Sequence, residues 1–214
     1  MILNMVDAWQ VIQQNIWNCS ACEHIPRVVL NIRQQTDLPV LPTKLLIIGI
    51  APPYRDGVSE KIRAKSATND PEDNLRKFLE ASLQLSYREL SERGLTILHA
   101  AKCAIRPKDR HQNPPHGVVE NCAPRHFTLE FLKLMPQVVV SLGERARRAV
   151  LKMPDCQKPP GLTLSGSLEG QYDIIIGDHT FKLFVSPFFD YDRETARSTL
   201  RAAALLSGLL VERG

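Results

Sequence analysis

The sequence predicts a three-layer α/β/α fold with a largely parallel central sheet of about four strands. Short apolar runs alternate along the chain with longer segments in which apolar residues recur at helical spacing. Strands that alternate with helices favour a parallel sheet with helices on both faces. No internal repeat or low-complexity segment interrupts this series, so we expect a single domain over residues 1–214.

The expected helices and strands follow one another along the chain. The helices are placed at residues 5–18, 70–83, 118–134, 144–152 and 192–212. Asp70 and Pro71 mark the start of the second helix with a capping side chain and a proline at the first helical position. The strands are placed at residues 45–50, 95–98, 137–142, 172–176 and 180–185. The first strand is continuously apolar, which is typical of a parallel strand buried on both faces.

The residue composition excludes several classes of protein. Hydrophobic residues make up 43% and charged residues 23% of the chain, which is typical of a globular protein and not of a disordered, collagen-like or coiled-coil one. No apolar run reaches the roughly 18 residues of a membrane span. The first residues lack the basic and small-residue pattern of a signal peptide. We therefore expect a soluble, monomeric protein in the reducing cytoplasm, with no membrane partner.

The net charge of +4 permits a polyanionic partner without requiring one. Basic side chains concentrate between Lys102 and Arg125, where Arg106, Lys108 and Arg110 lie in a polar, proline-bearing loop. These cations fit two interpretations, contact with nucleic-acid phosphates or a solvated surface.

Candidate ligand-binding residues follow the predicted strands, because ligands bind beyond the carboxyl ends of the strands in such sheets. Gly49, Ile50, Ala51 and Pro52 end the first strand with small and rigid residues, so main-chain amides can approach a ligand there. An ordinary strand-ending turn is the alternative. The segment is not a dinucleotide-binding loop, because the second and third glycines of that motif are missing.

Five cysteines add a second kind of candidate site. Cys19 and Cys22 form a C-x2-C pair after the first helix, Cys103 and Cys122 flank the basic loop, and Cys156 stands apart. In a reducing compartment, the first four are more typical of metal ligands than of disulfides. Zinc and iron–sulfur clusters both accept four thiolates, so the spacing does not choose the metal. Buried cysteines without a metal are the alternative.

Several short motifs follow one another in a distinctive order, namely C-x2-C at Cys19, Gly49-Ile50-Ala51-Pro52, Lys102-Cys103, Cys122, and Ser141-Leu142-Gly143 with Ala146. This order resembles the iron–sulfur branch of the uracil-DNA glycosylase superfamily, families 4 and 5, from Cys19 to the last helix. Ile50 followed by Ala51 is closest to family 5. The resemblance implies a structural [4Fe-4S] cluster, with redox sensing as a second possible role. Its implied ligands are Cys19, Cys22, Cys103 and Cys122, which leaves Cys156 as a free thiol.

The resemblance also implies a function, monofunctional excision of a base in base-excision repair. Such an enzyme flips uracil or a related deaminated or modified base out of single- or double-stranded DNA and hydrolyses its N-glycosidic bond. The implied location is the cytoplasm, in association with the nucleoid. The implied base pocket comprises Gly49, Ile50, Ala51, Pro52, Tyr54, Asn69 and Ser186.

Asp70 and His99 are the candidate catalytic residues. Asp70 matches a family aspartate whose carboxylate stabilises an oxocarbenium-like sugar and orients water, although capping a helix is a sufficient role for it. His99 stands where the family has an asparagine, and it can hydrogen-bond to the edge of the base.

Two further departures concern the base pocket. Ala67 replaces a stacking phenylalanine, and the segment from Phe184 to Pro187 replaces a His-Pro motif. A catalytically silent nucleic-acid-binding protein and a glycosidase acting on free nucleosides are the alternative functions.

Overall fold

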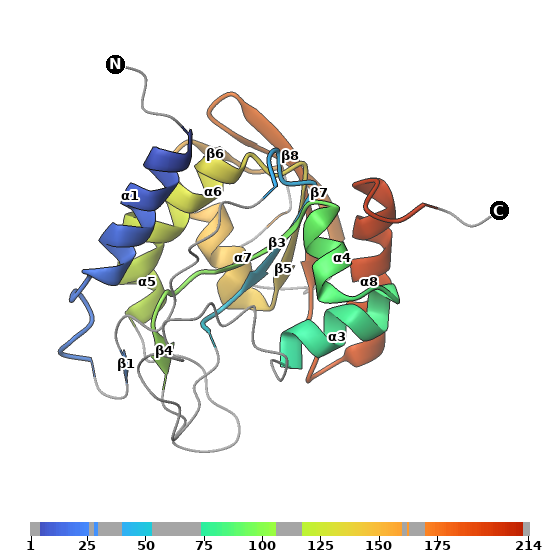
Figure 1. The fold of residues 1–214 in the computed structure, drawn as a ribbon, viewed down its shortest axis with the longest axis horizontal. Coiled ribbons are helices and arrows are strands. Elements are labelled where there is room, and N and C mark those ends of the chain that lie inside the picture. Colours follow the sequence, from blue (N-terminus) through green and yellow to red (C-terminus); the bar gives the residue numbers. More distant parts are fainter. Residues whose placement is uncertain are drawn as a thin grey trace.

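The computed structural model describes residues 5–25, 28–29, 40–52, 74–105, 117–159, 162 and 170–211. A six-stranded sheet runs through its centre in the order β3-β2-β5-β8-β7-β6 (Figure 1). The strands are β2 (Leu45–Gly49), β3 (Leu95–His99), β5 (Val138–Leu142), β6 (Cys156–Gln157), β7 (Gly170–Ile176) and β8 (His179–Ser186). The sheet has six strands where the sequence predicts about four, and β3, β2, β5 and β8 run parallel. Antiparallel β7 and β6 extend this parallel part at one edge.

Helices cover both faces of this sheet, which confirms the three-layer prediction (Figure 1). One layer contains α1 (Met5–Trp17), α5 (Val118–Cys122), the π-helix η2 (Ala123–Phe127), α6 (Thr128–Leu134) and α7 (Glu144–Leu151). The other layer contains α3 (Asn74–Leu83), α4 (Tyr87–Glu92) and α8 (Arg193–Leu206). A separate pair of two-residue strands, β1 (Val28–Val29) and β4 (Ala104–Ile105), lies outside the main sheet.

The continuous apolar run of β2 is explained by the two cores. Leu46 and Ile48 pack into the core under α1, α5 and α6, whereas Leu45 and Ile47 pack into the core under α3, α4 and α8. Side chains alternate between the faces of a strand, so both sets must be apolar when both faces are covered. All five residues of β2 are buried.

The last helix is shorter than the sequence predicts. It begins after Asp192 as expected, where the Asp192 carboxylate accepts a hydrogen bond from the Thr195 amide at 3.0 Å. It ends at Leu206 and not near residue 212, because Gly208 takes a left-handed conformation with φ of 66°. Leu206 is consequently 54% exposed, and Leu209 is buried instead.

Two helical features were not predicted. The short helix α4 begins with a capping box, in which the Ser86 amide donates to Glu89 Oε2 at 2.9 Å and the Glu89 amide donates to Ser86 Oγ at 3.3 Å. The expected helix 118–134 is continuous but contains the π-helical turn η2. Pro124 has no amide hydrogen to donate within this helix, and the Thr128 amide bonds to the Ala123 carbonyl five residues back.

The predicted start of the second helix at Asp70 lies outside the described residues, where α3 is described from Asn74 onward. None of the described helices is both long and apolar enough to cross a membrane.

A buried ion pair connects the first helical layer to the end of β3. Lys102 is 2% exposed and Glu130 is 1% exposed, and the Lys102 ammonium forms an ion pair with the Glu130 carboxylate. The ammonium also donates to the His99 carbonyl at 2.5 Å. Gln13 on α1 donates from Nε2 to Glu130 Oε1 at 3.0 Å. One group of polar contacts therefore holds α1, α6 and the segment after β3 together.

We expect the protein to lose much stability when one partner of the ion pair is removed, and to lose less when both are removed. Lys102→Met leaves a buried carboxylate without its cation and should lower the free energy of unfolding by about 3–5 kcal/mol. The double variant Lys102→Met/Glu130→Leu should recover much of that loss, because neither charge remains. Urea denaturation measures both variants, with Arg88→Met in the exposed Arg88–Glu92 pair as the control that should leave the midpoint unchanged. A double variant no more stable than the single one would contradict this account.

Candidate active site and cysteine pocket

The carboxyl ends of the four parallel strands bring several predicted site residues to one edge of the sheet. Gly49 pairs with His99 across β2 and β3, and Leu142 pairs with Ser186 across β5 and β8. The pairing continues past the strands, where the Ala100 amide donates to the Gly49 carbonyl at 3.0 Å. This edge is where ligands bind in open α/β sheets.

The imidazole of His99 lies directly against Gly49. His99 is 3% exposed, and a Cβ atom added to Gly49 would lie 3.0 Å from His99 Cδ2 and 3.3 Å from Nε2. A glycine is needed at position 49 because the ring occupies the space that a side chain would fill. The sequence predicts that a ligand approaches the main chain here, which stays a prediction; the close neighbour in the structure is the His99 side chain.

The other described members of the predicted pocket lie along the same edge of the sheet. Ile50 and Ala51 are half-buried and pack against the core under α1, and Pro52 is buried. Ser186 is fully buried, and its hydroxyl donates to the Pro187 carbonyl at 3.0 Å. The backbone of Ser186 accepts a hydrogen bond from the Gly143 amide at 2.8 Å. The structure thus brings the residues after β2, β3, β5 and β8 to one edge.

Six other predicted site residues remain expectations from the sequence. They lie outside the described residues, and they are Tyr54, Asn69, Asp70, Arg106, Lys108 and Arg110. Ala67, one of the departures from the family pattern, also lies there.

The four predicted metal ligands line one small cavity. Cys19 and Cys22 come from the turn after α1, Cys103 follows β3, and Cys122 ends α5. The cavity has a volume of about 10 Å³, and Cys156 is not among its lining residues. Ile16, Ala21, Lys102, Asn121, Arg125 and His126 complete the lining. None of the five cysteines, all of which the structure describes, forms a disulfide.

The surroundings of the thiols are buried and contain hydrogen-bond donors. Burial raises the pKa of Cys122 to about 12, against the opposing effect of the nearby Lys102 ammonium. The Lys102 amide donates to Cys122 Sγ at 3.1 Å. Burial also raises the pKa of Cys22, which a hydrogen bond with Asn121 opposes. A bound cation would supply the positive charge that thiolates need at these positions.

Four thiolates are a donor set that both a zinc ion and an iron–sulfur cluster accept. A zinc site needs four donors at about 2.0–2.3 Å from one point. In the part of the chain that the structure describes, no group of three or more His, Cys, Asp or Glu side chains is arranged to hold one ion. A [4Fe-4S] cluster instead takes its four thiolates at four separate irons. The cavity, at about 10 Å³, has room for about one water molecule.

His126 lines the cysteine cavity, although no sequence motif predicts it there. It is 7% exposed, lines the cysteine cavity, and neither ring nitrogen has a hydrogen-bond partner. Burial lowers its pKa, as does the nearby Lys102 ammonium, while the Glu130 carboxylate opposes them. Its spacing of four residues from Cys122 is the signal that could have indicated a shared helix face.

A second, larger cavity lies between α7 and the helix formed by α5 and η2. It has a volume of about 230 Å³, and its lining includes Arg145, Arg148, Lys152 and Glu120. Arg148 pairs with Glu144 at 2.5 Å, so part of this positive charge is neutralised.

Comparison with known proteins agrees with the architecture at the sheet edge. The profile of the Uracil DNA glycosylase superfamily matches residues 37–200, which is more than half of the chain. A search of curated proteins found no match. The matched region includes the whole six-stranded sheet with Gly49, His99 and Ser186, and it also includes Cys103 and Cys122. Cys19 and Cys22 precede it. The chain therefore belongs to the uracil DNA glycosylase superfamily.

Proposed function

We propose that this chain is a monofunctional DNA glycosylase that excises uracil or a related deaminated or modified base. Members of the superfamily are generally DNA glycosylases, which supports hydrolysis of an N-glycosidic bond in DNA. The observation that carries the proposal is the juxtaposition of Gly49 and His99 at the carboxyl edge of the sheet.

The reaction creates opposite charges on the two fragments of the substrate. Cleavage of the bond leaves an oxocarbenium-like sugar and an anionic base. A buried imidazole beside the base can donate a hydrogen bond to that anion, and such a donor is effective because its orientation is fixed in advance. His99 meets this requirement, since Gly49 and the core hold its ring in place.

The remaining steps are assigned to residues that only the sequence supports. Asp70 stabilises the cationic sugar and orients the attacking water. Tyr54 and Asn69 complete the pocket that Gly49–Pro52 and Ser186 begin. Arg106, Lys108 and Arg110 contact DNA phosphates, which position the duplex or single strand without reading its sequence.

We further propose a [4Fe-4S] cluster on Cys19, Cys22, Cys103 and Cys122. The shared cavity of these four thiols and the amide that Lys102 directs at Cys122 support it. When bound, the cluster supplies a covalent connection between three separate segments and a one-electron redox centre. The cysteines hold the turn after α1 against the segment that follows β3. Because this segment continues directly from His99 at the end of β3, they restrain one wall of the proposed base pocket.

Excision measurements test the proposed activity directly. Single-turnover assays should detect release of uracil, hypoxanthine or xanthine from single- or double-stranded DNA. Asp70→Asn should slow release by ~100-fold or more, because the negative charge is lost. Its melting temperature should stay unchanged, because Asn also caps helices. Asp192→Asn is the matched control, since Asp192 caps α8 and is not among the proposed catalytic or pocket residues, so excision should be unchanged. DNA binding without release of any base would instead favour the catalytically silent function.

The contact between Gly49 and His99 gives a second test. Gly49→Ala should lower the free energy of unfolding by about 1–3 kcal/mol, because the new methyl overlaps the imidazole. In the His99→Ala background the same change should be nearly neutral. Excision should fall at least about tenfold in all three variants, since each displaces or removes the donor. Equal destabilisation by Gly49→Ala in both backgrounds, measured by urea denaturation, would show that the ring is not the obstacle.

Metal analysis tests the proposed cofactor. Anaerobically prepared protein should carry roughly four irons per chain and absorb near ~400 nm. Cys122→Ala should lose most of the iron, because one thiolate is removed. Cys156→Ala should retain it, and this half-buried thiol outside the cavity makes a matched control. Stoichiometric zinc without iron would contradict the proposal.

A further inference from the structure

The buried imidazole of His126 lacks a hydrogen-bond partner. Its imidazole is more than nine-tenths buried, and neither Nδ1 nor Nε2 has a hydrogen-bond partner in the structure. A neutral imidazole carries one N–H donor and one lone pair. Polar groups removed from water are almost always hydrogen-bonded, so an unsatisfied one points to a missing ligand, ion or water.

The helix that carries His126 directs it at the cysteines. His126 follows Cys122 by four residues, a spacing that puts both side chains on the same helix face. Both side chains line the same small cavity. The π-helical turn adds a residue at this point, after which Phe127 and Phe131 still face the core. π-helical turns of this kind are frequent at functional sites.

Four cysteine sulfur atoms are among the acceptors that line the cavity. The Lys102 ammonium is engaged with Glu130 and the His99 carbonyl, and it offers only donors. Asn121 hydrogen-bonds to Cys22. Arg125 is a donor as well. The cysteine sulfur atoms, and those of any group they bind, are acceptors that line the same cavity as the ring.

We propose that His126 donates an N–H···S hydrogen bond to the cluster held by the four cysteines and raises its reduction potential. This inference rests on the proposed cofactor and assigns it one residue beyond its ligands. The physical reason is that reduction adds negative charge to the cluster and its sulfurs, and a donor stabilises that charge. Hydrogen bonds to sulfur and the degree of solvent exposure are the main means by which proteins adjust such potentials.

A redox titration of the intact, iron-loaded protein tests this role. His126→Leu removes the donor at similar bulk and should shift the reduction equilibrium about tenfold toward the oxidised form, which is about 59 mV for one electron. His126→Gln keeps an N–H donor and should restore most of the shift. His24→Leu is the control, because His24 is exposed in the turn that follows the same cysteine pair. An equal shift in His24→Leu would assign the effect to local charge and overturn the proposed hydrogen bond.

A second measurement does not depend on a variant that folds. Pulsed electron paramagnetic resonance of the reduced wild-type protein, labelled with ¹⁵N-histidine, should detect an imidazole nitrogen coupled to the cluster. Iron-loaded protein with no such coupling, or with the wild-type potential in His126→Leu, would overturn the role of His126 alone. Wild-type protein that binds no iron would overturn the proposed cofactor and this role together.

Discussion

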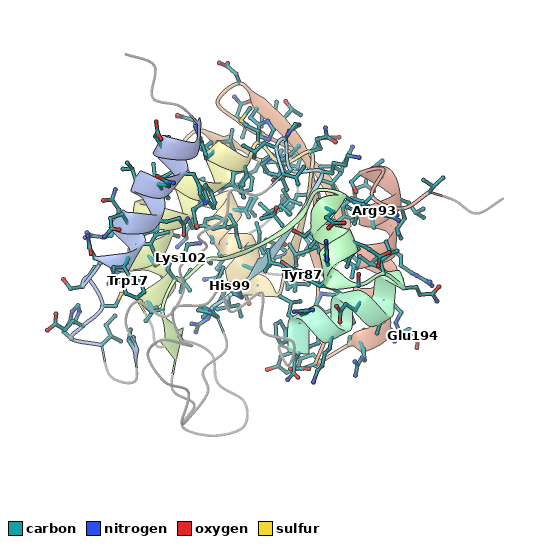
Figure 2. The ribbon with its side chains drawn as sticks, in the orientation of Figure 1. Trp17, Tyr87, Arg93, His99, Lys102 and Glu194 are labelled. Atoms are coloured by element: carbon teal, nitrogen blue, oxygen red, sulfur yellow. The ribbon has the colours of Figure 1, made fainter. Side chains whose placement is uncertain are left out.

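The ammonium group of Lys102 must be neutralised inside the protein, and much of the molecule is arranged around that requirement. Glu130 supplies the opposite charge from α6, Gln13 on α1 holds the other carboxylate oxygen, and the His99 carbonyl accepts a further hydrogen bond. The backbone amide of Lys102 also donates a hydrogen bond to Cys122 Sγ. Figure 2 labels His99 and Lys102. A buried pair of this kind tolerates little displacement, because either charge alone would be costly in a medium of low polarity.

This constraint joins the two candidate sites. His99 ends β3 at the proposed base pocket, and Cys103 lines the cysteine cavity four residues later. Lys102 lies between them and fixes the segment from both its side chain and its amide. A group bound by the cysteines would therefore act on the base pocket through rigidity. Small displacements of a catalytic donor lower reaction rates strongly, so a firm anchor for His99 has a direct chemical benefit.

His99 and Gly49 form one packing unit at the same edge of the sheet. The imidazole of His99 offers one N–H donor and one acceptor nitrogen, and it needs the bare backbone of Gly49 beside it. Ser186, at the end of β8, uses its hydroxyl on its own chain, so the described part of the pocket relies mainly on His99 for side-chain hydrogen bonding.

The sequence by itself determined those helices and strands in which buried apolar residues recur at a regular spacing. The continuous apolar run of β2 predicts a strand covered on both faces, and the residues after each parallel strand predict the edge that carries the site. It could not determine where α8 ends, because the apolar spacing continues past the left-handed Gly208. Only the tertiary structure brought Cys19 and Cys22 to Cys103 and Cys122, and turned His126 into their cavity. Such contacts depend on how distant segments pack, which leaves no periodic signal in the sequence. The four-residue spacing of His126 from Cys122 indicates a shared helix face but not the cavity that this face lines.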